Sequence, residues 1–264
     1  MRISHLLSIL ILILIVLSPR PAAAGQPGQG LLLDEASRFF QQASQLEDGG
    51  KDAELYRKAQ IRFEKLVADG VVNGKLYYNL GNTYFRLHDL GRAVLNYRRA
   101  LRYLPEDDNL RQNLLAARGQ QQDRIEPRQE AMIAKTLFFW HYDLSPRSRL
   151  LLLAMANLAL WGGLGLRVHR RRSPWWPLVV ALLLATMMAG SLLHERFGRP
   201  AGGVLVAAET VARKGDGLAY GPSFTAPLHS GLEFSLVEKR GEWLYIELAD
   251  GRRCWVSTED AEII

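Results

Sequence analysis

Cysteine is almost missing from this chain of 264 residues, because Cys254 is the only one. A single thiol excludes an intramolecular disulfide framework, and it cannot supply the paired cysteines of a structural zinc site. Cys254 lies beside Trp255 in a segment that we expect to be a strand. A buried thiol is favoured there, and intermolecular pairing in an oxidising compartment is the alternative.

The motifs of common enzyme classes are also missing. The six histidines are scattered, without a His-Glu-x-x-His pair. The chain has no Gly-x-Ser-x-Gly elbow and no Gly-x-x-x-x-Gly-Lys phosphate loop. We interpret Gly215-Asp216-Gly217 as a turn and not as a nucleotide loop. The sequence therefore predicts a protein that is not an enzyme and that has no catalytic, cofactor-binding or metal site.

Charge-free apolar runs occur three times, and the first is close to the N-terminus. Leu6–Leu17 follows Arg2 and His5 and precedes Ala22-Ala23-Ala24. A basic start, a short apolar run and small residues at a cleavage site are typical of a secretory signal peptide. We predict a signal peptide over residues 1–24, with an uncleaved N-terminal anchor as the alternative.

The other two runs, residues 150–166 and 175–193, are predicted to be transmembrane helices. The loop between them, residues 167–174, contains four arginines and no acidic residue. The positive-inside rule places this loop in the cytoplasm and both flanking regions outside, in agreement with the signal peptide. Two buried helices of a soluble protein are the alternative, but the flanking sequence offers nothing that could wrap both. The net charge of +6 comes partly from these arginines, so it does not indicate nucleic-acid binding.

A tetratricopeptide (TPR) pattern occupies residues 74–107, which is one period of about 34 residues. Small residues are expected where the two helices of the repeat cross, large ones fill the space between them, and a proline ends the second helix. The matching residues are Tyr77, Leu80, Gly81, Tyr84, Ala93, Tyr97, Ala100 and Pro105. The pattern predicts a helical hairpin of a class that binds other proteins.

The TPR region is predicted to extend over residues 31–118. A weaker repeat precedes the strong one, with Ala59 and Phe63 in its second helix. Its first helix is expected to place Phe39, Ala43 and Leu46 in the roles of Tyr77, Gly81 and Tyr84. Residues 108–118 are expected to form a capping helix, because Leu115 stands at the glycine position of a further repeat.

The first helix of a TPR usually presents its inner face to an extended peptide. In this chain the positions are Lys75, Tyr78, Asn82, Phe85 and Arg86. Asn82 is suited to hydrogen-bond a peptide backbone, and Arg86 is suited to pair with a carboxylate. A solvated helix face is the alternative.

Residues 119–149 are predicted to be a polar linker followed by a juxtamembrane segment. Ala131–Tyr142 is rich in aromatic residues. Two interpretations remain open for it, a segment that lies along the bilayer and an ordinary start of the first membrane helix.

Residues 203–264 alternate apolar and polar residues between turns, as in a small β-barrel. Gly241-Glu242-Trp243-Leu244-Tyr245-Ile246, then Ala249-Asp250-Gly251-Arg252 and Trp255-Val256, resembles the bacterial SH3 pattern. That resemblance implies binding of peptides or cell-wall fragments, with Trp243, Tyr245 and Trp255 as candidate contacts. Packing within the barrel is the alternative for each, and it is favoured for Trp255.

The predicted fold class is therefore multi-domain, with an all-α TPR solenoid, a two-helix transmembrane hairpin and an all-β SH3-like barrel. This order resembles the BatE (aerotolerance) family of bacterial inner-membrane proteins. Three segments support the resemblance: Tyr78-Asn79-Leu80-Gly81-Asn82-Thr83-Tyr84, Leu110-Arg111-Gln112-Asn113-Leu114 and Ile125-Glu126-Pro127. The resemblance implies an accessory protein in stress tolerance, with von Willebrand factor A domain membrane proteins and a MoxR-type ATPase as partners.

Two functions are compatible with these features. One is a scaffold in the bacterial inner membrane that presents its TPR and SH3 modules to protein partners on the periplasmic side. The other is a membrane protein that binds peptidoglycan through the SH3 domain.

Overall fold

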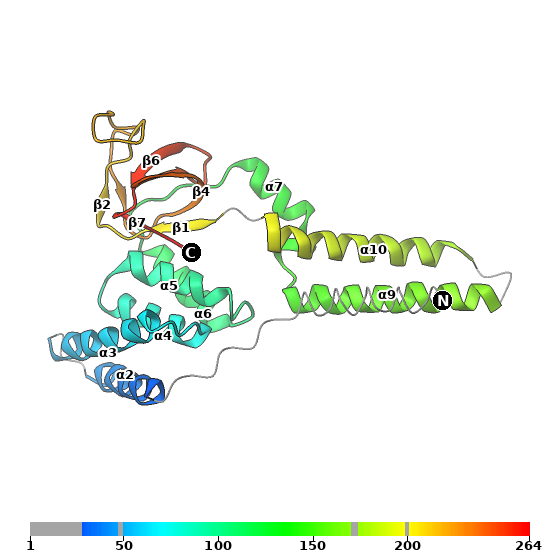
Figure 1. Ribbon diagram of the computed structural model, residues 1–264, viewed down its shortest axis with the longest axis horizontal. Helices are drawn as coiled ribbons and strands as arrows, with labels where there is room; N and C mark the ends of the chain where they lie inside the picture. The colour runs from blue at the N-terminus through cyan, green and yellow to red at the C-terminus, as the bar shows by residue number, and fades with distance from the viewer. Residues whose placement is uncertain (1–27, 47–49, 170–173, 199–200) are drawn as a thin grey trace. The chain divides into compact units, whose positions relative to one another are not determined.

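The computed structural model describes residues 28–46, 50–169, 174–198 and 201–264 (Figure 1). The chain divides into two compact units, residues 1–76 and 77–264, which we describe separately. The predicted signal peptide, residues 47–49 and residues 170–173 of the predicted cytoplasmic loop lie outside the described residues.

The first unit contains an antiparallel pair of helices, α2 (Gln29–Ser44) and α3 (Lys51–Ala68). Ala43, Ala59 and Phe63 are buried between them, at the positions that the weaker repeat predicts. The prediction for Leu46 is wrong. Helix α2 has ended at Ser44 before the chain reaches Leu46, which is 40% exposed and does not fill the space between the helices.

Three further helices form the strong repeat and its cap: α4 (Gly74–Arg86), α5 (Leu90–Leu101) and α6 (Asp108–Gly119). Helices α5 and α6 each begin at a capping aspartate. The Asp89 carboxylate accepts a hydrogen bond from the Arg92 N–H, and the Asp107 carboxylate accepts one from the Leu110 N–H. Most large side chains of the repeat pattern are buried together with its alanines: Leu80, Tyr84, Ala93, Tyr97 and Ala100. Tyr77 is the exception, because it is half-buried and stacks on Tyr103 with ring centroids 6.1 Å apart.

Gly81 shows why the pattern needs a small residue. A Cβ atom at this position would lie 2.7 Å from Cδ1 of Tyr97, which is well inside the van der Waals distance. The absence of a side chain therefore lets α4 and α5 approach each other, as the repeat pattern predicts.

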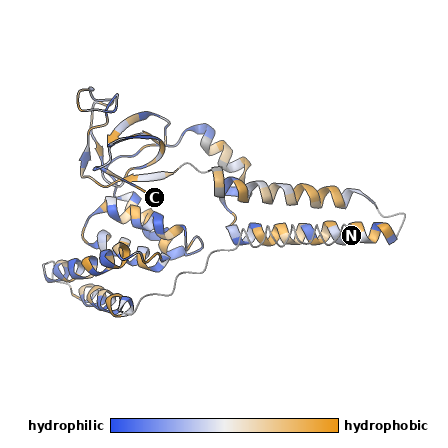
Figure 2. Ribbon diagram, viewed as in Figure 1, coloured by the Kyte–Doolittle hydropathy of each residue, from blue (hydrophilic) through white to orange (hydrophobic). Residues whose placement is uncertain are grey.

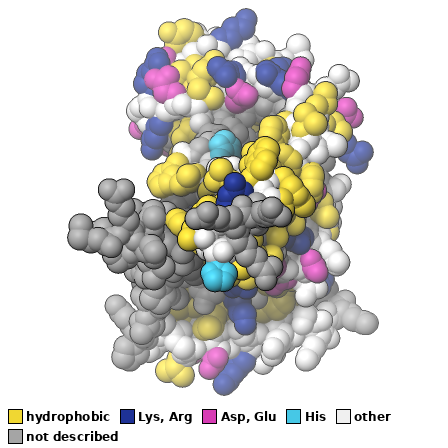
Figure 3. Space-filling view, turned by 90° about the vertical axis from the view of Figure 1, so that its right-hand side faces the viewer, with side chains coloured by type: hydrophobic (Ala, Val, Ile, Leu, Met, Phe, Trp, Pro, Cys, Tyr) yellow, Lys and Arg dark blue, Asp and Glu magenta, His cyan; other side chains and the backbone are white. Residues whose placement is uncertain are grey.

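Two long apolar helices, α9 (Pro146–His169) and α10 (Trp176–Leu193), lie side by side and are joined at one end (Figure 1). They are preceded by α7 (Gln129–Leu137) and the short α8 (Phe139–Tyr142), and a π-helical turn, η1 (His194–Gly198), follows them. Both are long and apolar enough to span a membrane (Figure 2). Only 6% and 22% of their most apolar windows are buried within the protein, so their apolar side chains face outward (Figure 3).

The last region is a five-stranded antiparallel sheet with the order β6-β5-β4-β1-β7, and a two-stranded sheet of β2 and β3 accompanies it. The strands are β1 (Gly202–Leu205), β2 (Glu209–Thr210), β3 (Leu228–His229), β4 (Glu233–Arg240), β5 (Trp243–Glu247), β6 (Arg253–Ser257) and β7 (Ala261–Ile263). The core contains the alternating side chains that the sequence predicts to face inward, among them Leu232, Phe234, Leu244, Ile246 and Cys254.

Within residues 201–264 no barrel is closed, because β6 and β7 form opposite edges of the sheet. After the turn at Asp260, strand β7 pairs with β1, where Ile263 lies opposite Gly203, and not with β6. A single bridge between Arg213 and Trp255 continues the pairing on the free side of β6.

The helices and the sheet of the second unit contact each other directly. A Cβ atom at Gly91 of α5 would lie 2.8 Å from the Leu205 carbonyl oxygen, so the helix backbone lies against the end of β1. Arg118 of α6 donates two hydrogen bonds to Glu233 of β4, at 2.6 and 2.9 Å. The chain that follows α6 continues along the sheet, since the Asp123 carboxylate accepts from the His229 N–H at 2.6 Å.

Candidate protein-binding site

A polar cluster joins the first helix of the strong repeat to the capping helix. The Asn82 side-chain oxygen accepts hydrogen bonds from the Tyr97 hydroxyl and the Asn113 amide, both at 2.8 Å. The same Asn113 amide donates to the Tyr78 hydroxyl at 3.0 Å. These four residues, which we call the Asn82 cluster, connect α4, α5 and α6.

The capped start of α6 and the close crossing at Gly81 place these side chains. Asp107 fixes the first turn of α6, and Asn113 lies in the second turn of the same helix. Tyr97 packs its ring against Gly81 and extends its hydroxyl to Asn82. The register of the cluster is therefore set by the same small and large residues that define the repeat.

Hydrogen-bonding capacity remains in the cluster for a ligand. The Tyr78 hydroxyl accepts from Asn113, so its own proton is available to a further acceptor. The Asn82 oxygen is used twice, and its amide nitrogen is the part of the side chain suited to donate. Backbone carbonyls and carboxylates of a peptide are acceptors of the matching kind.

Electrostatics keep the cluster neutral and place a positive charge near it. Burial raises the pKa of Tyr97, the neighbouring Tyr78 raises it further, and Arg86 opposes both. The Tyr97 phenol therefore keeps its proton and donates it to Asn82. Because Arg86 acts on Tyr97 and is itself exposed, its guanidinium is a cation beside the cluster that an acidic group of a partner can reach.

The other two residues predicted on this helix face, Phe85 and Lys75, differ in exposure. Phe85 is half-buried, and Lys75 is exposed in the first turn of α4. The Lys75 N–H is bonded to the Asn73 side chain at 2.8 Å, which fixes the start of the helix. The structure thus brings Tyr78 and Asn82 into one network, with Arg86 acting on it.

Sequence reasoning missed Asn113. The repeat period could have indicated this residue. Asn113 stands 34 residues after Asn79 of α4 and therefore takes the equivalent place on α6. The helix that we expected only to cap the solenoid also supplies a polar side chain to its face.

Some of the aromatic residues predicted as contacts on the β region pack against other residues of the sheet. Tyr245 and Trp255 stack with ring centroids 4.9 Å apart, and the Arg240 guanidinium lies 4.9 Å from the Trp255 ring. Trp255 is buried, whereas Trp243 and Tyr245 are half-buried on β5. The core interpretation of Trp255 agrees with this burial, and Trp243 and Tyr245 retain surface that a ligand can contact.

Cys254 is buried in the sheet beside these aromatics. Burial raises the pKa of its thiol to about 12. The thiol is therefore protonated at neutral pH and is not suited to nucleophilic or metal chemistry. Among the described residues no group of three or more His, Cys, Asp and Glu side chains is arranged to hold a metal ion.

The comparison with known families identifies one repeat of the helical part. The family model of the tetratricopeptide repeat matches residues 74–107, which confirms the predicted repeat and its bounds. A search of curated proteins with the chain finds no match. TPR repeats generally mediate protein–protein interactions, and the repeat at residues 74–107 suggests this kind of role.

Proposed function

We propose that this protein is a non-catalytic scaffold of the bacterial inner membrane that binds protein partners through the Asn82 cluster and the neighbouring Arg86. The observation that carries the proposal is a donor-rich face on a TPR hairpin, beside an exposed arginine. A TPR solenoid commonly uses such a face to hold an extended peptide, and the arginine favours an acidic group on it.

The membrane location is supported by α9 and α10, of whose most apolar windows only 6% and 22% are buried within the described part of the chain. With the predicted signal peptide and the arginine-rich loop, we propose that both large regions lie on the periplasmic side. We also propose that the β region is SH3-like and supplies a second, weaker contact through Trp243 and Tyr245. Two modules confined to one membrane face raise each other's effective concentration toward a shared partner.

The resemblance to the BatE family supports partners among von Willebrand factor A domain membrane proteins and a MoxR-type ATPase system, in stress tolerance. No cofactor and no reaction is part of this proposal.

Co-purification from detergent-solubilised membranes tests the proposal. The double variant Tyr78→Ala and Arg86→Ala removes one donor of the cluster and its neighbouring cation. We expect partner recovery to fall strongly, while the matched Arg57→Ala variant, an exposed arginine on α3, keeps it. Unchanged recovery with the double variant would remove the α4 face from the proposal.

Peptidoglycan binding is the competing function, and the same protein tests it. If the intact chain sediments with purified peptidoglycan and Trp243→Ala abolishes this, the β region is the main binding module. The stacking of Tyr245 on Trp255 favours the scaffold, because that stack leaves less aromatic surface open to a sugar ring.

A further inference from the structure

The short helices α7 and α8 expose an unusual amount of apolar surface. Six large side chains between residues 132 and 142 are each 50–62% exposed: Met132, Ile133, Leu137, Phe138, Phe139 and Tyr142. Single exposed apolar residues are common on soluble proteins, but a contiguous set of this size marks a contact surface.

This segment is not the start of the first long helix. The helical conformation is interrupted between α7 and α8 at Phe138, with φ −105° and ψ 38°, and α8 ends at Tyr142. Helix α9 begins separately at Pro146, where the Ser145 hydroxyl accepts a hydrogen bond from the Ser148 N–H at 3.1 Å. Of the two interpretations left open by the sequence, a continuous start of the first membrane helix is therefore excluded.

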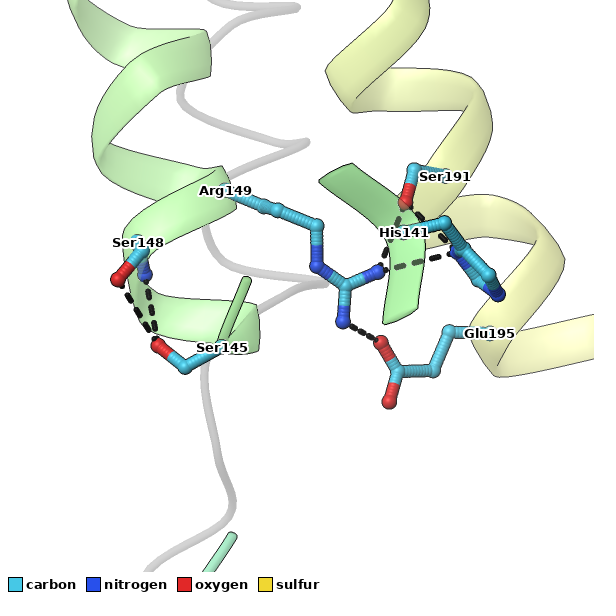
Figure 4. Close-up of polar contacts among 6 residues, drawn as sticks. All are labelled: His141, Ser145, Ser148, Arg149, Ser191 and Glu195. Atoms are coloured by element: carbon cyan, nitrogen blue, oxygen red, sulfur yellow. Dashed lines mark hydrogen bonds and ion pairs between the residues drawn. The ribbon is translucent and has the colours of Figure 1, made fainter. Parts of the chain in front are cut away.

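A buried polar cluster ties α8 to one end of the hairpin (Figure 4). Arg149, in the first turn of α9, is only 1% exposed. Its guanidinium forms an ion pair with Glu195, donates to the Ser191 hydroxyl at 2.8 Å, and lies 3.3 Å from Nδ1 of His141. The Ser191 hydroxyl is also 2.8 Å from the same nitrogen of His141. We call these four residues the Arg149 cluster.

The position of the Arg149 cluster fixes the level of α8 along the hairpin. Arg149 lies at the beginning of α9, whereas Ser191 and Glu195 lie at the end of α10 and just beyond it, so the cluster marks the end opposite the loop. A charged pair of this kind is far less costly near the membrane surface than in the hydrocarbon core. The cluster therefore places α8 at the level where the two apolar helices leave the bilayer.

We infer that residues 129–142 lie in the interfacial layer of the same bilayer, with their apolar side chains at the boundary between lipid headgroups and acyl chains. The inference rests on the proposed function, in which α9 and α10 span that membrane. Trp140 and Tyr142 are of the residue types that favour this layer, and short amphipathic segments bind there through buried apolar area. The Arg149 cluster holds α8 against the end of the hairpin. The lipid surface therefore lies beside the exposed apolar side chains.

Spin labels on the full-length protein in nanodiscs of phosphatidylethanolamine and phosphatidylglycerol test the inference. Three single variants are labelled: Ile133→Cys in α7, Leu158→Cys in α9 and Ile61→Cys in α3. Ile133 and Ile61 are matched in type and in exposure, at 58% and 62%, and Leu158 is 74% exposed. The buried native Cys254 does not compete for the label. Collision rates with oxygen and with a water-soluble nickel chelate report the depth of each label.

We expect the label at position 158 to be deep in the hydrocarbon, the label at 61 to be in water, and the label at 133 at headgroup depth. The nickel collision rate at 133 should be several-fold lower than at 61, with a higher oxygen rate. A label at 133 that behaves like the one at 61, while 158 is deep, overturns this inference alone. Protection of position 133 from both reagents also overturns it, because it indicates a protein neighbour such as a second copy. A label at 158 in water contradicts the membrane proposal itself.

Discussion

Replacing Gly81 by alanine tests the packing that sets the whole binding face. The new Cβ would lie 2.7 Å and 2.8 Å from Cδ1 and Cε1 of Tyr97, so the ring has to move. Tyr97 is 1% exposed and its hydroxyl is bonded to Asn82, which leaves the ring little freedom to move without breaking that bond.

The magnitude follows from two opposing effects. Overpacking a close-packed site costs about 1–3 kcal/mol. Alanine is a better helix former than glycine by about 1 kcal/mol, which offsets part of this cost. The two effects together leave a net loss of up to about 2 kcal/mol, equivalent to a decrease of up to about 30-fold in the folded-to-unfolded ratio.

Hydrogen exchange measured by mass spectrometry on the full-length protein in detergent resolves the effect locally. Amides of α4 and α5 should lose protection by that factor, while amides of β4 and β5 change little. Gly119→Ala is the control, because a Cβ at that helix end meets nothing within 4 Å, and it should leave protection unchanged or raise it. Increased protection in Gly81→Ala would refute the close-crossing argument.

Two further predictions concern groups buried elsewhere in the chain. Cys254 should resist a maleimide at pH 8 until the β region unfolds, whereas the exposed position in Ile61→Cys reacts at once. Since burial raises the pKa of Cys254 from 9.0 to about 12, the unfolded chain releases this proton at lower pH than the folded one. Stability of the β region should therefore fall as pH rises between these values, less so in Cys254→Ala, and equal slopes would contradict the burial argument. Glu195→Gln leaves the Arg149 guanidinium buried without its ion-pair partner. Removing one partner of a fully buried pair lowers stability by about 3–5 kcal/mol. We expect a smaller loss here, since the Glu195 side chain is 25% exposed. The spin label at position 133 should become more mobile in this variant and not in Glu209→Gln, an exposed acid on β2. Equal spectra would show that the Arg149 cluster does not position the segment of residues 129–142.

The sequence predicts best those features that a local pattern determines. The repeat over residues 74–107 follows from small and large residues at fixed spacing, because a side chain at Gly81 would force the Tyr97 ring to move. The two apolar helices follow from run length, although α9 begins at Pro146, earlier than hydropathy indicates, and includes the charged Arg149. A hydropathy window counts that arginine as an interruption, whereas its partners on α10 and η1 accommodate it.

Features that depend on distant segments were not predictable from local patterns. His141, Arg149 and Glu195 meet across about 50 residues of chain, and no spacing rule connects them. The alternation in the last region predicts its strands, but the pairing of β7 with β1, which leaves the sheet open, depends on where a turn directs the chain. Leu46 shows the converse error, because a helix that ends at Ser44 cancels an otherwise matching position.

The most direct test of the central claim is photo-crosslinking from the proposed binding face in intact cells. A benzophenone amino acid replaces Phe85, which is half-buried on α4 beside Arg86. The control replaces Leu115, which is 62% exposed on α6, two residues beyond Asn113 and therefore on a different side of that helix. The scaffold account predicts a discrete protein adduct from position 85 that mass spectrometry assigns to one partner, that Arg86→Ala abolishes, and that position 115 does not give. Equal adducts from both positions, or an adduct from position 85 that persists in Arg86→Ala, would contradict it.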